Sequence, residues 1–163
     1  LRNALPSIRL VIAGRGTEES SLRRLVARFD LGKNVQFFGW VDYEHSFAFQ
    51  AVADMLIAPR RPLQNRGIDI STPMKIPSYL TASRPIIASR VGEIPYMARH
   101  MKEAFLVPHS DPGSLAQAVL TIWNDPTLSR HLSAGARARA EQYSWKLIAS
   151  ELSDLYERIL TVS

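Results

Sequence analysis

The sequence of 163 residues contains no cysteine, which excludes disulfides and thiolate metal sites. This absence agrees with a reducing compartment. No apolar run approaches the ~20 residues that a membrane-spanning helix requires. The four histidines, at positions 45, 100, 109 and 131, lack the spacing of a metal site, so we expect no bound metal.

Clustered basic residues are also missing. The formal net charge is +5, yet the basic side chains are scattered along the sequence. A nucleic-acid-binding surface usually shows a compact Lys/Arg patch with aromatic side chains between the charges, so we expect no nucleic-acid partner. A phosphorylated small substrate or an anionic membrane surface would also account for the surplus, as would a plain solvated surface.

Short apolar segments alternate with amphipathic helical stretches. Strands are predicted at Ile8–Ala13, Val35–Phe38, Met55–Ala58, Ile86–Ser89 and Ala104–Val107. Helices are predicted at Glu18–Phe29, Tyr43–Ala51, Pro73–Ala82, Leu115–Trp123, Thr127–Gln142 and Lys146–Leu160. Strands separated by helices imply right-handed crossovers. The pattern therefore predicts an α/β fold: a Rossmann-like, doubly wound parallel sheet with helices on both faces, closed by C-terminal helices, in a single domain over residues 1–163.

Two loops follow predicted strands at the edge where such a sheet binds ligands, beyond the carboxyl ends of its strands. They are Gly14–Gly16 and Arg60–Thr72. Gly14, Arg15 and Gly16 open a helix, and glycines there let the backbone approach a phosphate. The third glycine of the dinucleotide fingerprint is missing, which argues against a standard NAD site. A plain strand-to-helix turn explains the loop equally well.

The segment Gly67–Pro95 carries a second anion-site pattern. Ser71 and Thr72 precede Pro73, a residue favoured at the first helical position. Ser71 or Thr72 can cap the helix, and the free N–H groups of its first turn would attract an anion. Lys75 adds a positive charge there. A capped surface helix whose lysine faces water is the alternative interpretation.

Several spaced stretches occur in an order that is typical of one protein family. They are Leu10–Gly16, Val35–Val41, Ala53–Asp54 with Pro59, Pro73 with Lys75 and Tyr79, Arg84–Ser89, Gly92–Pro95, Val107–Ala116 and Tyr143–Trp145. Over its full length the chain resembles the donor-binding domain of retaining glycosyltransferases of family 4, the "group 1" transferases with the GT-B fold. The family pattern around the central helix is P-x-K-x-x-E-Y-x-A-x-G-x-P.

This resemblance implies a fragment of a longer two-domain protein, namely the C-terminal half. It implies a nucleotide-diphosphate sugar as co-substrate, retaining transfer without a metal or other cofactor, and the protein's own N-terminal domain as partner. The base would rest near Gly39, Trp40 and Val41, and the diphosphate near Ser71–Met74. The family's catalytic groups lie upstream of Leu1, so we expect no catalytic residue here and no turnover by this chain alone.

The chain departs from the family at its two glutamates, whose positions hold Ile70 and Ser78. The second glutamate accepts both ribose hydroxyls, whereas Ser78 offers one hydroxyl with a shorter reach. Pro77 beside it can kink a helix unless it lies in the first turn. Asp69 could supply a carboxylate through a shifted loop, although Asp is common in loops for turn chemistry. A degenerate domain acting as a binding or scaffold module is therefore the alternative function.

The resemblance also bears on location. Many enzymes of this family glycosylate lipid-linked or polysaccharide acceptors at the inner face of a membrane. We therefore expect a cytoplasmic protein, with a peripheral contact to the membrane surface as a hypothesis that the net charge of +5 would favour. The sequence contains no dedicated basic amphipathic helix that would carry this contact.

Overall fold

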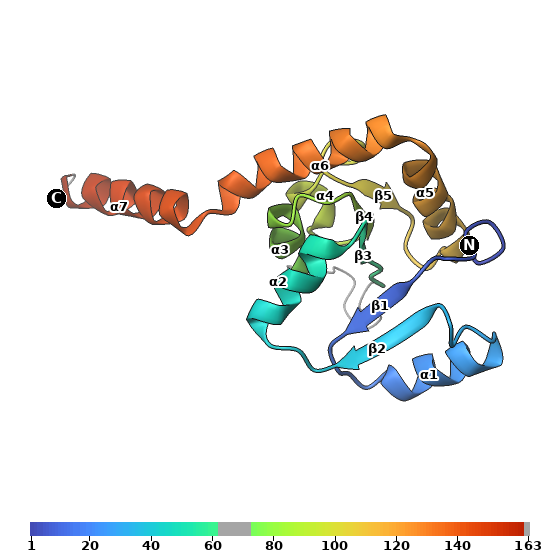
Figure 1. Ribbon diagram of the computed structural model, residues 1–163. Helices are drawn as coiled ribbons and strands as arrows, with labels where there is room; N and C mark the ends of the chain where they lie inside the picture. The colour runs from blue at the N-terminus through green and yellow to red at the C-terminus, as the bar shows by residue number, and fades with distance from the viewer. Residues whose placement is uncertain (62–72, 162–163) are drawn as a thin grey trace. The chain divides into compact units, whose positions relative to one another are not determined.

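A computed structural model describes residues 1–61 and 73–161 (Figure 1). These residues form two compact units, one of Leu1–Phe49 and one that begins at Gln50. Both contain parallel strands connected through helices, which confirms the predicted α/β class. That residues 1–163 act as a single domain stays a prediction.

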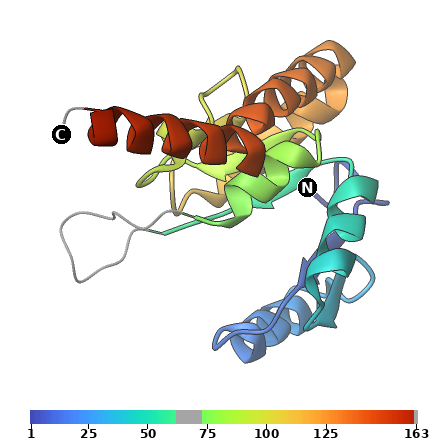
Figure 2. The same cartoon turned by 90° about the vertical axis from the view of Figure 1, so that its left-hand side faces the viewer.

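The first unit is built on two parallel strands. β1 (Leu10–Ala13) pairs with β2 (Val35–Gly39), with Leu10 opposite Val35. Helix α1 (Glu19–Arg28) connects them, and Figure 2 shows it running alongside the pair. The side-chain amide of the buried Asn34 donates to the Pro6 and Ile8 carbonyls at 3.2 and 2.9 Å, which fixes the approach to β1. No residue of α1 or β1 is buried, although the apolar stripe of α1 has the predicted spacing.

The second unit contains three parallel strands in the order β3 (Leu56–Ala58), β4 (Ile86–Ser89) and β5 (Phe105–Val107). Every residue of the central strand β4 is buried. The remaining helices are α3 (Lys75–Thr81), α4 (Ile94–Met97), α5 (Pro112–Asn124), α6 (Pro126–Ala140), the 3-10 turn η1 (Glu141–Tyr143) and α7 (Trp145–Thr161). The helix α2 (Tyr43–Val52) begins in the first unit and ends in the second.

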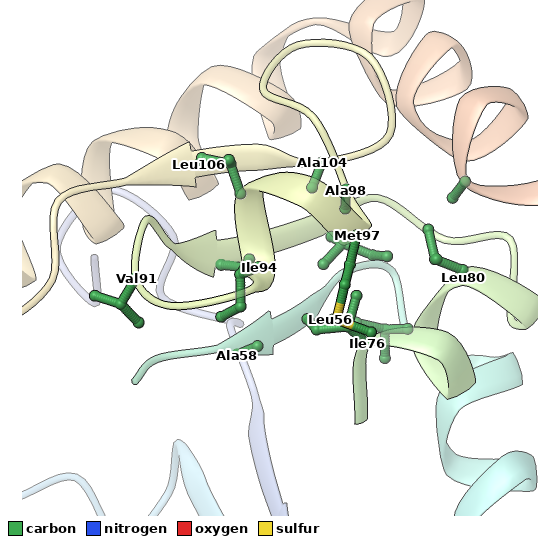
Figure 3. Close-up of a cluster of buried hydrophobic side chains, with 13 residues drawn as sticks. Leu56, Ala58, Ile76, Leu80, Val91, Ile94, Met97, Ala98, Ala104 and Leu106 are labelled. Atoms are coloured by element: carbon green, nitrogen blue, oxygen red, sulfur yellow. The ribbon is translucent and has the colours of Figure 1, made fainter. Parts of the chain in front are cut away.

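The core of the second unit joins α3 and α4 to the sheet. Ile76 and Leu80 of α3 are fully buried, and Met97 of α4 points toward Leu56 of β3 and toward Ile76 (Figure 3). Burying an aliphatic side chain of this size stabilises the folded state by about 1.5–3 kcal/mol. Although α3 is short, this burial holds it firmly against the sheet.

Two helices begin earlier than their apolar periodicity predicts because aspartates cap them. Asp111 accepts a hydrogen bond from the Ser114 N–H at 2.9 Å, and Asp125 accepts from the N–H groups of Thr127 and Leu128, each at 2.9 Å. A proline follows each aspartate at the first helical position, where no backbone donor is needed. Helices α5 and α6 therefore begin at Pro112 and Pro126.

Helix α4 has no counterpart among the predicted helices, because Gly92–Pro95 has the composition of a turn. Pro95 is the second residue of this helix, a position that needs no backbone donor. The guanidinium of Arg139 on α6 donates to the Met97 and Tyr96 carbonyls at 3.0 and 2.8 Å. These bonds satisfy acceptors at the end of α4, and they come from a residue far away in the sequence.

A buried carboxylate closes the loop between α4 and β5. The Glu103 side chain is only 3% exposed, pairs with the Arg99 guanidinium and accepts the Arg99 backbone N–H at 2.7 Å. Burial alone would raise the pKa of this carboxyl, but the hydrogen bonds from Arg99 and the attraction of Arg99 and Lys102 outweigh burial and lower the pKa. Glu103 is therefore ionised in the folded protein at neutral pH.

Candidate functional site

At the carboxyl ends of β1 and β2, two of the predicted donor-binding segments lie together. The Gly14 N–H donates to the Gly39 carbonyl at 2.5 Å, where the register shifts so that Ala13 lies opposite Gly39. Gly14 and Gly39 have φ angles of +117° and +67°, which side-chain-bearing residues rarely adopt. A Cβ atom on Gly39 would lie 3.7 Å from Nε of Arg15. The Gly14–Gly16 and Gly39–Val41 loops are therefore neighbours.

This pair of loops is open to a ligand. Gly14, Arg15 and Gly16 are exposed, and a Cβ added to Gly14 or Gly16 would meet no atom within 4 Å. Trp40 is 71% exposed and offers an aromatic face beside them. The first turn of α1 contains Glu19, whose carboxylate accepts hydrogen bonds from the Arg23 guanidinium at 3.0 and 2.9 Å. The exposed glycine backbone and the aromatic side chain of Trp40 suit a base or a ribose.

An aspartate and a histidine fix the segment that follows Val41. The Asp42 carboxylate accepts the backbone N–H of His45 at 2.8 Å and thereby caps the start of α2. It also lies 2.7 Å from Nδ1 of the His45 ring. These two hydrogen bonds from His45, the backbone one first, lower the pKa of the Asp42 carboxyl. This pair was not predicted from the sequence, although an Asp just before the start of a helix is a recognisable capping signal.

In the second unit, α3 begins two residues later than predicted. The Pro73 carbonyl accepts the Ile76 N–H at 3.0 Å, and Met74 occupies the position before the first helical residue, Lys75. The prediction that Pro73 is the first helical residue is therefore wrong. Pro73 is buried, whereas Met74 (80% exposed) and Lys75 face solvent. Asp69, Ile70, Ser71 and Thr72 lie outside the described residues.

Ser78 occupies the family's second glutamate position and has a partner within the protein. Its hydroxyl donates to the Gln50 side-chain oxygen at 2.8 Å, so the oxygen of Ser78 is left only to accept further hydrogen bonds. Pro77 is the third residue of α3 and lies in its first turn, where a helix needs no N–H donor. The kink that Pro77 could have caused is therefore avoided.

Two arginines have their backbones fixed at the carboxyl ends of β3 and β4. The Arg60 N–H donates to the hydroxyl of the buried Ser89 at 2.9 Å, and the Arg90 N–H donates to the Val107 carbonyl at 2.8 Å. The loop after β3 was predicted from the sequence as a ligand-binding loop, but Ser89 and Arg90 were not. Arg90 adds positive charge at the carboxyl end of β4.

A concave surface lies at the opposite, amino-terminal edge of the same sheet. It is a groove of about 510 Å³ whose lining includes Asp54, Arg84, Trp123 and Arg130. These residues precede β3, precede β4, or lie on α5 and α6. Nothing in the sequence pattern predicted this groove, and it provides a competing location for a ligand.

Among residues 1–61 and 73–161, no three His, Asp or Glu side chains gather in a way that could hold a metal ion. Within the same ranges, no helix has both the length and the apolar character needed to cross a bilayer.

Known proteins provide an independent comparison. Residues 1–125 match the family model described as "Glycosyl transferases group 1". The phosphatidyl-myo-inositol mannosyltransferase of Mycobacterium leprae is 31% identical over 169 residues, an alignment that covers 99% of this chain and 42% of that protein. The GDP-mannose-dependent monoacylated alpha-(1-6)-phosphatidylinositol monomannoside mannosyltransferase of Corynebacterium glutamicum is 29% identical, covering 94% of this chain and 40% of that protein.

Solved structures agree with the family model. The sucrose-phosphate synthase of Thermosynechococcus elongatus superposes with a TM-score of 0.80 at 25% identity, covering 98% of this chain and 40% of that one. Anabaena Alr3699/HepE in complex with UDP has the same fold, with a TM-score of 0.75 at 19% identity, covering 91% and 42% of the two chains. This chain thus spans about 40% of the length of these relatives. The chain belongs to the group 1 glycosyltransferases, which have the GT-B fold.

Proposed function

We propose that this chain is the donor-binding part of a glycosyltransferase and holds a nucleotide-diphosphate sugar. The observation that carries the proposal is the contact between Gly14 and Gly39, which makes an open, glycine-lined surface beside Trp40 at the carboxyl ends of β1 and β2. Relatives support a nucleotide-sugar ligand by their names: one is GDP-mannose-dependent, and HepE was solved with UDP and with UDP-glucose.

In this proposal different residues contact different parts of the donor. Gly39, Trp40 and Val41 contact the base, with the Gly14–Gly16 backbone beside it, because Gly14 donates to the Gly39 carbonyl. The diphosphate lies against the Ser71–Met74 segment and Lys75, whose positive charge favours an anion. Ser78 accepts one ribose hydroxyl, and Asp69 is a candidate for a second acceptor.

The remaining parts of the proposal concern the full-length protein. Transfer proceeds with retention and without a bound metal, and an N-terminal domain supplies the catalytic groups and the acceptor site. The protein is cytoplasmic, and any membrane contact is peripheral. We do not expect this chain alone to turn over a donor.

A scaffold function without donor turnover is the second candidate. The bond between Ser78 and Gln50 favours it, because a hydroxyl already engaged inside the protein replaces a carboxylate that would accept two ribose hydroxyls. The scaffold and donor-binding functions differ in nucleotide affinity, which can be measured directly.

The test is a calorimetric titration of the full-length protein with UDP, GDP, ADP and their sugars. We expect one nucleotide family to bind well below millimolar concentration, and Lys75→Ala to weaken that binding about 10- to 100-fold, the loss of a charge-assisted hydrogen bond. Lys146→Ala is the matched control, since Lys146 is an exposed lysine of α7. The nucleotide affinity of this variant should equal that of the parent protein. Binding at millimolar concentration or weaker across the whole panel would favour the scaffold function.

A further inference from the structure

The groove at the amino-terminal edge of the β3–β5 sheet has the features of a second ligand site. Its volume of about 510 Å³ lies within the range of about 300–1,000 Å³ that is usual for small-molecule sites. All of its lining residues belong to the second unit, so the groove is formed within that unit. We propose that it binds an uncharged carbohydrate, with Trp123 packed against a sugar ring. This proposal goes beyond donor binding and does not depend on it.

Trp123 supplies an apolar wall of the groove. Its side chain, on α5, is 51% exposed and lies among Pro85, Ile122 and Pro126 in the lining. The face of a sugar ring that carries C–H groups is apolar, and an exposed aromatic ring gives it a flat, rigid surface on which to pack. The groove therefore offers one broad apolar contact of the kind that a sugar ring needs.

Two arginines of the lining supply hydrogen-bond donors. Arg84, which precedes β4, donates to the Ala51 carbonyl through one terminal nitrogen. Arg130 of α6 makes a single long contact of 3.5 Å from its guanidinium to the Thr127 hydroxyl. A guanidinium carries five N–H donors, so each of these side chains keeps donors for a ligand while its position is held by the protein.

The same groove also contains acceptors. The exposed carboxylate of Asp54 makes no hydrogen bond or ion pair with the residues that the structure describes. The Ser133 hydroxyl donates to the Ser129 carbonyl at 2.9 Å, so its oxygen is left to accept. A sugar hydroxyl both donates and accepts, and it can use the arginines and these acceptors together.

The charges of the lining disfavour simpler ligands. Arg84 and Arg130 are positive and Asp54 is negative, and no other charged side chain lines the groove. A phosphate would be repelled by the carboxylate, and a cation would be repelled by the two guanidinium groups. A neutral ligand with several hydroxyls can satisfy all three side chains without opposing any of them.

Proton–nitrogen NMR of the full-length protein, titrated with neutral mono- and disaccharides of glucose, galactose and mannose, tests the proposal. The indole N–H signal of Trp123, identified by its loss in Trp123→Phe, should shift saturably with at least one saccharide. Asp54→Asn should weaken that binding about 10-fold, the loss of a charged acceptor. Trp145→Ala is the matched control, because Trp145 is 84% exposed on α7 and does not line the groove, and its saccharide affinity should equal that of the parent protein.

Three outcomes would overturn the proposal. The first is a Trp123 signal that no saccharide of the panel shifts. The second is a signal that inorganic phosphate shifts and the saccharides do not, which would assign the groove to an anion. The third is a saccharide shift that disappears when a bound nucleotide saturates the protein, which would place the sugar in the donor site. A protein that binds saccharide here but binds no nucleotide would support the groove and contradict only the donor-binding function.

Discussion

Gly135→Ala is expected to lower the free energy of unfolding by about 3 kcal/mol or more. A Cβ atom at this position of α6 would lie 1.9 Å from the Lys102 carbonyl oxygen and 2.9 Å from its carbon. Both atoms belong to backbone, so a side-chain rotation cannot relieve the clash, and overpacking costs are at the upper end of their range. Without the clash, Gly→Ala inside a helix would stabilise by about 0.5–1 kcal/mol.

Urea unfolding followed by circular dichroism measures this effect, with Gly32→Ala as the control. A Cβ at Gly32 would meet no atom within 4 Å, and its φ angle is not positive, so we expect a change within about 1 kcal/mol. A Gly135→Ala variant as stable as the parent protein would show that α6 does not pack this closely on the Lys102 backbone.

Glu103→Gln is expected to cost about 1.5–3 kcal/mol at neutral pH, because it removes charge-assisted hydrogen bonds from a buried site. The folded-state pKa of Glu103 lies below its ordinary value of 4.5. The stabilisation is therefore complete above pH 4.5 and is lost as pH falls through the folded-state pKa. The difference in stability between parent and variant should shrink over that acidic range.

Unfolding measured at several pH values checks this prediction. Glu151→Gln is the matched control, since Glu151 is exposed on α7, and it should change stability little at any pH. A parent–variant difference that stays constant as the pH is lowered well below 4.5 would show that Glu103 does not titrate as described.

Elements formed by local pattern were predicted well from the sequence. The strand Ile86–Ser89 was predicted with its exact bounds, because four apolar or small residues are enclosed between Pro85 and a turn. Helix ends were less accurate, since capping by Asp111 and Asp125 extends α5 and α6 toward the N-terminus beyond their apolar stripes. Helix α4 was not predicted, because a proline shortly after a glycine is also typical of a turn.

Features that depend on distant residues could not be predicted. Gly14–Gly16 was correctly predicted to follow a strand and to precede a helix. Only the pairing of β1 with β2 shows that Gly14 contacts Gly39. The partner of Ser78 is Gln50, 28 positions away, and no local pattern joins them. Among the described residues β1 pairs only with β2, and the alternation of strands and helices along the sequence does not predict which strands pair.

The most direct test of donor binding at the carboxyl ends of the strands is an amide chemical-shift titration of the full-length protein with the nucleotide that binds. We expect saturable shifts at Gly14–Gly16, Gly39–Val41, Met74 and Lys75. Shifts confined to the groove around Arg84, Trp123 and Arg130, at the opposite edge of the β3–β5 sheet, would contradict the proposed site.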